Sequence, residues 1–234
     1  MIALLVPVLG RAHQIQPLFE NISAATQTDH RVIFICSPAR FDKEAVAACR
    51  AIKEAVTLKA SWKPGRADYA MKLGLGFHGT DEPWLFQGAT DLVFYAGWDL
   101  SALAVARQTN CGVIGTNDLG NPLVKRGRHS THTLFSREYI EQYGGTADGS
   151  GVIFSEAYDH QWTDSEFIET ATLRRQFAFA RRSVVEHLHP HWGKAEMDET
   201  YEKAHRATSN DQKLFVRRRA VVMRGESKRK RSKA

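Results

Sequence analysis

Short apolar runs alternate with amphipathic segments through the first half of the chain. The runs IALLVPVL (2–9), HRVIFICSP (30–38) and WLFQGA (84–89) have the length of buried strands. The segments IQPLFENISAAT (15–26) and DKEAVAACRAIKEA (42–55) carry apolar residues at helical spacing. This alternation predicts a three-layer α/β domain, with a mostly parallel sheet flanked by helices.

The second half continues the pattern after one long interruption. We expect a helix over 99–110, a strand over 111–118, a helix over 164–182, and a strand and turn over 183–192. Residues 119–150 are polar and rich in His and Gly, which is typical of a loop region.

A glycine motif in the first half is a false lead. GLGFHG matches the dinucleotide-binding pattern G-x-G-x-x-G at Gly74, Gly76 and Gly79. That pattern binds phosphate when a strand precedes it and a helix follows, because the helix N-terminus then faces the ligand. Here a predicted helix over 66–77 comes first, and a turn and a strand follow. We therefore interpret these glycines as the end of a helix.

Composition favours one domain without a membrane span. A length of 234 residues with 43% hydrophobic content is enough for a single packed core. Cys36, Cys49 and Cys111 show no C-x-x-C spacing, which argues against a disulfide framework or a zinc site. The apolar opening MIALLVPVLGR lacks a basic leader and is too short to cross a bilayer. We therefore expect a cytoplasmic protein.

The positive charge is concentrated near the C-terminus. The chain has a net charge of +6, and residues 211–234 hold ten Lys or Arg against two acids, so the rest is slightly acidic. We interpret 1–210 as a single domain and 211–234 as a basic tail, either mobile in solution or in contact with a polyanion such as DNA. The last basic cluster contains no aromatic residue, so base stacking is not indicated there.

The end of the third principal strand carries an isolated acid. Ligands of open α/β sheets bind beyond the carboxyl ends of the strands, and Asp91 follows WLFQGA at such an end. A divalent cation bound to a diphosphate needs only one or two protein carboxylates. Asp91 is therefore a candidate metal ligand, and the alternative is an acid that caps the turn into YAGWD.

Two histidines near the end of the predicted fold are candidates for the same metal. His187 and His189 are two residues apart in VVEHLHPHW, so a strand would place both on one face. Imidazole together with carboxylate and phosphate oxygens suits manganese or a similar cation. Such a pair can equally be buried and hydrogen-bonded to the backbone.

A third cluster precedes the late helix. AYDHQWTDSEF contains Tyr158, His160, Trp162, Asp164 and Glu166. Acids at a helix N-terminus satisfy unpaired backbone N–H groups, which accounts for one of them. An aromatic ring beside carboxylates also suits a sugar or nucleoside acceptor, which needs an apolar face and a group that takes a hydroxyl proton.

Seven segments in this order resemble a known family. They are VPVLGR, RADYAMKLG, FQGATDLVFYAGW, VIGTNDLGN, HSTHTLFSREYIEQYGGTADGSG, AYDHQWTDSEFIETA and VVEHLHPHWGKAEMDETY. The chain resembles glycosyltransferases of the GT-A fold over about residues 1–205, similar to family two and to the small enzymes encoded by tailed bacteriophages. The resemblance implies sugar transfer from a nucleotide-sugar to an acceptor hydroxyl, with inversion and with a metal ion.

The resemblance also implies roles for the candidate residues. Donor binding would fall to Pro7, Arg11, Ser37, Asp68, Thr90 and Asp91, and acceptor binding to Asp118, Tyr158, His160 and Trp162. Asp164 would be the general base, with Glu166 in reserve, and Mn²⁺ or Mg²⁺ would be held by Asp91 with His187 or His189. The segment GATD departs from the family, because Gly88 and Thr90 replace the acids of its Asp-x-Asp signature.

Other functions compete with this interpretation. A sugar nucleotidyltransferase shares the sheet and the metal but needs a glycine-rich basic loop after the first strand, where VPVLGRAHQ offers one Gly and one Arg. A nucleic-acid-binding protein with a degenerate, non-catalytic body fits the basic tail and the missing acids. For the enzyme, the acceptor is open among modified DNA, a virion protein and host glycans, and the tail favours an anionic acceptor.

Overall fold

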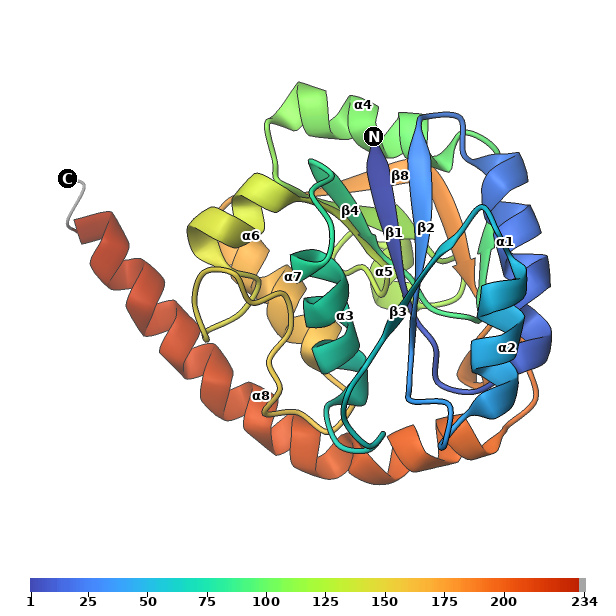
Figure 1. Ribbon diagram of the computed structural model, residues 1–234. Helices are drawn as coiled ribbons and strands as arrows, with labels where there is room; N and C mark the ends of the chain where they lie inside the picture. Colours follow the sequence, from blue (N-terminus) through green and yellow to red (C-terminus); the bar gives the residue numbers. More distant parts are fainter. Residues whose placement is uncertain (232–234) are drawn as a thin grey trace.

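The structure, a computed structural model, describes residues 1–231, apart from the side chains of residues 200, 203–205, 207 and 226–231. This part of the chain forms a sheet of eight strands with helices on both faces (Figure 1). The strands are β1 (Ile2–Pro7), β2 (His30–Cys36), β3 (Val56–Lys59), β4 (Trp84–Gln87), β5 (Leu92–Phe94), β6 (Val113–Asn117), β7 (Thr133–Ser136) and β8 (Phe177–His187). The α-helices are α1 (Ala12–Ala25), α2 (Lys43–Ala51), α3 (Asp68–His78), α4 (Trp98–Thr109), α5 (Pro122–Lys125), α6 (Arg137–Tyr143), α7 (Thr163–Leu173) and α8 (Glu199–Arg231).

The strands run in the order β3-β2-β1-β4-β7-β6-β8-β5. β1 pairs in parallel with β2 and β4, β2 with β3, and β6 with β8. β7 is antiparallel to both its neighbours, and β5 is antiparallel to β8. The predicted α/β class with a mostly parallel sheet is confirmed. The carboxyl ends of β1, β2 and β4 therefore lie at one edge, where such sheets bind ligands.

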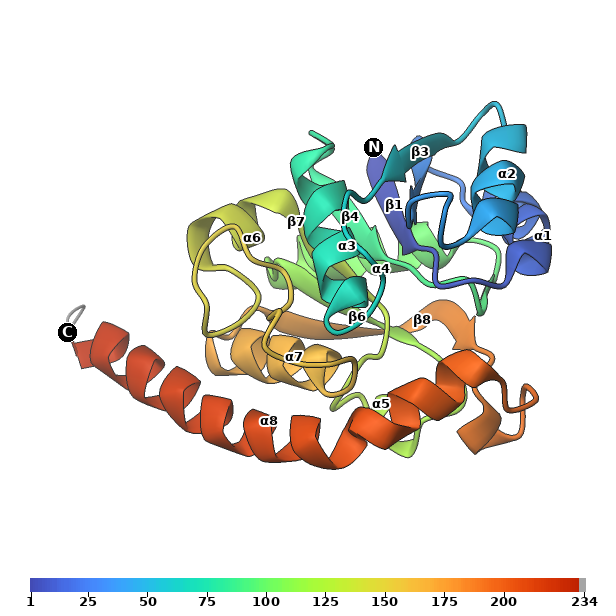
Figure 2. The same cartoon turned by 60° about the horizontal axis from the view of Figure 1, so that its bottom comes forward.

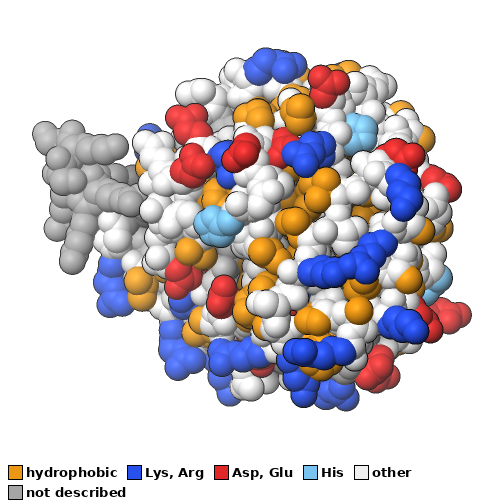
Figure 3. Space-filling view, viewed as in Figure 1, with side chains coloured by type: hydrophobic (Ala, Val, Ile, Leu, Met, Phe, Trp, Pro, Cys, Tyr) orange, Lys and Arg blue, Asp and Glu red, His pale blue; other side chains and the backbone are white. Residues whose placement is uncertain are grey.

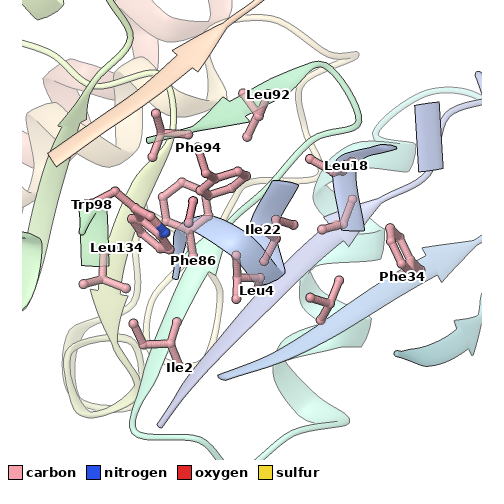
Figure 4. Packing of buried hydrophobic residues seen from close by; sticks show 14 of the residues in the cluster. Ile2, Leu4, Leu18, Ile22, Phe34, Phe86, Leu92, Phe94, Trp98 and Leu134 are labelled. Carbon is pink, nitrogen blue, oxygen red and sulfur yellow. The ribbon is translucent and has the colours of Figure 1, made fainter. Parts of the chain in front are cut away.

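Two apolar layers hold the sheet between its helices. Ile2, Leu4 and Val6 of β1 pack into the layer that also contains buried residues of α1, α2 and α4 (Figure 4). Their neighbours Ala3 and Leu5 belong to the other layer, with buried residues of α3, α6 and α7. β1 is buried on both faces, as the continuous apolar run in the sequence indicated.

The glycines of the GLGFHG segment lie at the end of a helix, as predicted. Gly74 and Gly76 are inside α3, and Gly79 is its C-cap. A Cβ on Gly76 would come within 2.9 Å of a side-chain carbon of Ile35. The small residue therefore lets α3 pack close to the sheet.

Two secondary-structure predictions were wrong. The helix predicted over 164–182 ends at Leu173, and Phe177–His187 forms β8. Arg175 adopts a positive φ of 59° at the break, and the following residues pair with β6 and β5. The predicted loop over 119–150 contains α5, β7 and α6, and Ser136 caps α6 by accepting a hydrogen bond from the Tyr139 N–H.

The predicted boundary between residues 210 and 211 falls inside α8, which runs beneath the body of the protein (Figures 1 and 2). Asp211 is buried and accepts hydrogen bonds from three consecutive backbone N–H groups, those of residues 159–161. Val222 is also buried. Residues 211–222 are thus packed against the domain, whereas the side chains of the basic cluster at 228–233 lie outside the described residues. No helix in residues 1–231 has the length and apolar character needed to cross a membrane.

Candidate active site

Asp91 lies between β4 and β5 with its side chain almost fully buried. One carboxylate oxygen, Oδ2, accepts a hydrogen bond from Arg11 at 2.7 Å and another from the Tyr201 hydroxyl at 2.6 Å. The other oxygen, Oδ1, is buried and has no hydrogen-bond partner within the described residues. A buried carboxylate oxygen without a partner is costly, and this oxygen is available to bind a ligand.

Arg11 is fixed at the carboxyl end of β1. Gly10 and Arg11 both have positive φ angles, 85° and 56°, which turn the chain out of the strand and into α1. The guanidinium forms two bonds to Asp198, at 2.7 and 3.1 Å, and lies 4.2 Å from the centre of the Tyr201 ring. The beginning of α8 therefore closes over the end of β1.

Three histidine rings surround Asp91. His187 Nε2 lies 3.7 Å from Asp91 Oδ2, because β8 pairs His187 with the residue that follows Asp91. The His187 ring contacts those of His132 and His189, with centroids 4.9 and 5.0 Å apart. Burial, together with the charge of His187, lowers the pKa of both His132 and His189 to about 4. Both imidazoles are thus neutral at pH 7, the form that binds metal.

The charge of Asp91 is stabilised despite its burial. Burial alone favours the neutral acid, but the neighbouring His187, Arg11 and Tyr201 hold the pKa of the Asp91 carboxyl well below its usual range. Asp91 is therefore an anion at neutral pH.

The protein ligands available for a metal are few. Among the described residues, no group of three or more His, Cys, Asp and Glu side chains is arranged to hold an ion. Asp91 Oδ1 and a neutral imidazole provide an oxygen and a nitrogen of the type that Mn²⁺ accepts. The side chains present thus fit an ion that takes most of its ligands from phosphate and water.

Asp164 lies in the first turn of α7 and pairs with a histidine from the loop before β7. Its Oδ1 accepts the Ser165 N–H at 2.7 Å, and its Oδ2 lies 3.2 Å from His129 Nε2. Although burial opposes both charges, the pair lowers the pKa of Asp164 and raises that of His129. An ionised carboxylate held in this way has the charge required of a base.

These groups line two adjoining cavities. The first has a volume of about 620 Å³ and is lined by Pro7, Arg11, Thr90, Asp91, His160, Trp162, Asp164, His187 and His189 among others. The second has a volume of about 950 Å³ and is lined by residues that include Ser37, Asp68, Arg11 and His160. Leu9, Arg11, Tyr69 and His160 border both. The structure thus brings together most of the residues predicted for the site.

A fully buried lysine supports the wall of the second cavity. Lys72 donates hydrogen bonds to the backbone oxygen of Val8, to Ser37 and to Asp68, at 2.7 to 2.8 Å. Asp68 also accepts the Trp62 indole N–H at 2.8 Å. Lys72 therefore joins the ends of β1 and β2 to α3, and it fixes the positions of Ser37 and Asp68.

Three predicted site residues lie outside both cavities. Glu166 is 1% exposed and binds the Tyr158 hydroxyl at 2.7 Å and the Arg218 guanidinium at 2.7 and 3.0 Å. Asp118 accepts the N–H groups of residues 120 and 121 and the hydroxyl of Thr131. Glu166 and Tyr158 thus form a buried network beneath α8, and Asp118 shapes the loop after β6.

Two aromatic residues of the predicted acceptor cluster do line the first cavity. Trp162 has a positive φ of 68° and stacks on Phe215 of α8, with centroids 5.2 Å apart. The His160 ring lies edge-on to Tyr69 at 5.9 Å. Their positions depend on Asp211, which anchors the loop that carries them.

Sequence reasoning missed several residues of this site. Tyr201 and Asp198 reach Asp91 and Arg11 from the start of α8, and His129 reaches Asp164 from a loop. The sequence offered one signal for them, the acid Asp198 in MDETY directly before a helical segment. In the structure Asp198 caps α8 by accepting the Tyr201 N–H at 3.0 Å. Neither pairing leaves a local pattern, because the partners are 110 and 35 residues apart.

Solved structures of other proteins have a similar fold. The chain superimposes on a mannosyltransferase from Pyrobaculum calidifontis in complex with GDP-Man and Mn²⁺, with a TM-score of 0.61, 14% identity, and coverage of 80% of this chain and 57% of that one. It also matches S. aureus TarS, with a TM-score of 0.58, 11% identity, and coverage of 79% and 36%. The chain has a GT-A-like fold.

A third match is S. aureus TarS in complex with UDP-GlcNAc, with a TM-score of 0.56, 13% identity, and coverage of 86% of this chain and 63% of that one. The chain therefore spans less than two thirds of the length of each of these proteins. No protein-family model and no curated protein sequence matches it significantly.

Proposed function

We propose that the protein is a glycosyltransferase that moves a sugar from a nucleotide-sugar to an acceptor hydroxyl with inversion. The observation that carries this proposal is that the carboxylates of Asp91 and Asp164 line one cavity at the carboxyl edge of a GT-A-like sheet. The solved structures with GDP-Man and UDP-GlcNAc bound support a nucleotide-sugar as the donor.

The two cavities suit the two parts of such a donor. The larger cavity, bordered by Ser37 and Asp68, has room for the nucleoside, and the smaller one for the sugar and the acceptor. Arg11 borders both cavities, so its guanidinium is placed to bind the diphosphate between them. In this role it would exchange Asp198 or Asp91 for phosphate oxygens.

A divalent cation, Mn²⁺ or Mg²⁺, fits this proposal as a cofactor that arrives with the donor. Asp91, through its unpartnered Oδ1, and His187 or His189 would hold it. Such an ion supplies positive charge that stabilises the departing nucleoside diphosphate. Arg11 adds a permanent positive charge at the same place, so the chain itself contributes to this stabilisation.

Asp164 is the proposed general base. It is ionised, partly open to the cavity, and held through both oxygens by the Ser165 N–H and by His129. It would accept the proton of the acceptor hydroxyl as that oxygen attacks the anomeric carbon. Trp162 and His160 border the same cavity and would position the acceptor.

The candidate acceptors are modified DNA, a virion protein and host glycans. The basic residues of α8 support an anionic acceptor, and so favour DNA carrying hydroxylated bases.

Two measurements test the proposal. A panel of UDP- and GDP-sugars with Mn²⁺ is expected to contain a donor that raises the thermal stability of the protein and is slowly hydrolysed. Asp164→Asn should reduce turnover by about a hundredfold or more while leaving donor binding nearly unchanged. Asp81→Asn, at an exposed position, serves as the control. If no nucleotide-sugar binds, the enzyme proposal is wrong, and an equal loss of binding and turnover in Asp164→Asn rejects Asp164 as the base.

A further inference from the structure

One side of α8 carries a row of cations. Lys213, Arg217 and Arg224 are exposed, and their spacing of four and seven residues places them within about 40° of one another around the helix axis. Arg206, seven residues before Lys213, continues the same row. From Arg206 to Arg224 the row extends for about 27 Å along the helix.

The opposite side of α8 attaches the helix to the protein. Asp211, Phe215, Arg218 and Val222 lie roughly 120 to 180° from the cationic row and make the contacts with the body. Because this side is held by a buried carboxylate, a ring stack and an ion pair, the helix has a fixed rotation. The row of cations therefore faces solvent.

The exposed side of residues 203–225 of α8 carries no acidic side chain. Between residues 203 and 225 the sequence has a single acid, Asp211, which is buried. Within the described residues, none of the four cations forms an ion pair, whereas their neighbour Arg219 is paired with Glu169. Basic side chains gather along the edge of the molecule formed by α8 (Figure 3).

We propose that this row binds the phosphate backbone of double-stranded nucleic acid. A duplex carries one charge per about 1.7 Å of its axis, so it offers many phosphates over the length of this row. Three of the four residues are Arg, whose planar fork suits phosphate oxygens. The row has no aromatic side chain, so it contacts the backbone and does not stack on unpaired bases.

The arrangement disfavours an anionic membrane as the partner. A helix that lies on a bilayer inserts its apolar side among the lipids. In α8 the rings and aliphatic groups opposite the cations, Phe215 and Val222, are already packed against the protein. Val216, Val221 and Met223 remain exposed, but they lie on both sides of the cationic row and do not form the single apolar side with which a helix lies in a bilayer, so the row itself offers charge to a partner.

The row also ends beside the proposed donor site. Arg206 and Asn210 border the larger cavity, and Tyr201 and Thr208 of the same helix border the smaller one. A duplex held along the row would thus reach the rim of the larger cavity at Arg206. Binding along the row does not depend on sugar transfer, so the two proposals can fail separately.

The test compares two variants with equal changes in charge. In the first, Lys213, Arg217 and Arg224 are replaced by Gln. In the second, the exposed Lys43, Arg50 and Lys53 in and after α2 are replaced by Gln. Affinity for an unmodified 20-base-pair DNA duplex is measured by fluorescence anisotropy between 50 and 200 mM salt.

We expect the α8 variant to lose on the order of a hundredfold in affinity at 50 mM salt, and its slope of log K against log[salt] to fall by about 3 relative to the unaltered protein. The α2 variant should keep the slope. Equal losses in both variants would mean that only net charge matters, and an unchanged slope in the α8 variant would assign binding to other residues; either result overturns the proposal. Binding to anionic vesicles, with none to DNA, also refutes it.

Discussion

Arg218 offers a quantitative test of whether α8 is part of the domain. Its guanidinium binds both oxygens of Glu166, at 2.7 and 3.0 Å, and one oxygen of Asp148 at 2.6 Å. The Glu166 side chain is 1% exposed, so replacing Arg218 with Met leaves a buried carboxylate without its counter-ion. Breaking a buried pair in this way costs about 3 to 5 kcal/mol of the free energy of unfolding.

The expected shift is large enough to measure directly. For a chain of this size each kcal/mol lowers Tm by about 2 to 4 °C, so Arg218→Met should unfold roughly 6 to 20 °C below the unaltered protein. The adjacent Arg219 provides a matched control, because its partner Glu169 lies at the surface and Arg219 is half exposed. Arg219→Met should cost at most about 1 kcal/mol. Urea denaturation of both variants gives the two free energies.

A second change separates charge from packing. Glu166→Gln removes the buried charge and keeps the shape, so the double variant with Arg218→Met should recover part of the lost stability. Glu166→Gln alone should also retain donor turnover, because Glu166 lies outside both cavities. Similar small effects of Arg218→Met and Arg219→Met would refute the idea that α8 is anchored by this ion pair.

Two further predictions concern pH. Burial lowers the pKa of His132 from about 6.5 to about 4. The unfolded chain therefore protonates His132 at a higher pH than the folded protein does. The free energy of unfolding should thus fall by up to about 3 kcal/mol as the pH is lowered from 6.5 to 4. Urea denaturation of His132→Gln over this range should show a flatter dependence, and an identical slope would contradict the assignment. His129→Gln removes the partner that lowers the pKa of Asp164, so the acidic limb of the kcat/KM profile should move to higher pH. An acidic limb that does not move would show that Asp164 is not the titrating base.

The strands that the sequence predicted best are those whose burial is complete. β1 and β2 are apolar along most of their length, so the local pattern defines them without help from the rest of the fold. β7 has only four residues with a polar residue at each end, and it exists because β4 and β6 pair with it. The apolar residues after Leu173 fit helical spacing as well as alternation, and only pairing with β6 decides for the strand.

The residues of the candidate site likewise fall into those that the sequence could predict and those that it could not. Residues at the ends of apolar strands, such as Asp91, could be predicted because the sheet topology itself brings strand ends to one edge. His129 and Tyr201 could not be predicted. Their partners Asp164 and Asp91 are 35 and 110 residues away in the sequence, and no local pattern indicates either pairing. Charge composition was misleading for Arg218, since a basic residue in a basic segment gives no sign that it faces a buried acid.

The order in which a ribosome releases the chain gives α8 a particular importance. Tyr201, Asp211 and Arg218 supply partners for Asp91, for the loop at 159–161 and for Glu166, and all three emerge after every strand of the sheet. A nascent chain that stops short of them would leave Asp91 without the Tyr201 hydroxyl and Glu166 without the Arg218 guanidinium. The contacts of the site and of the loop at 159–161 would thus be completed only once α8 has been synthesised, and a polypeptide cut off before α8 is expected to unfold and to be degraded more readily.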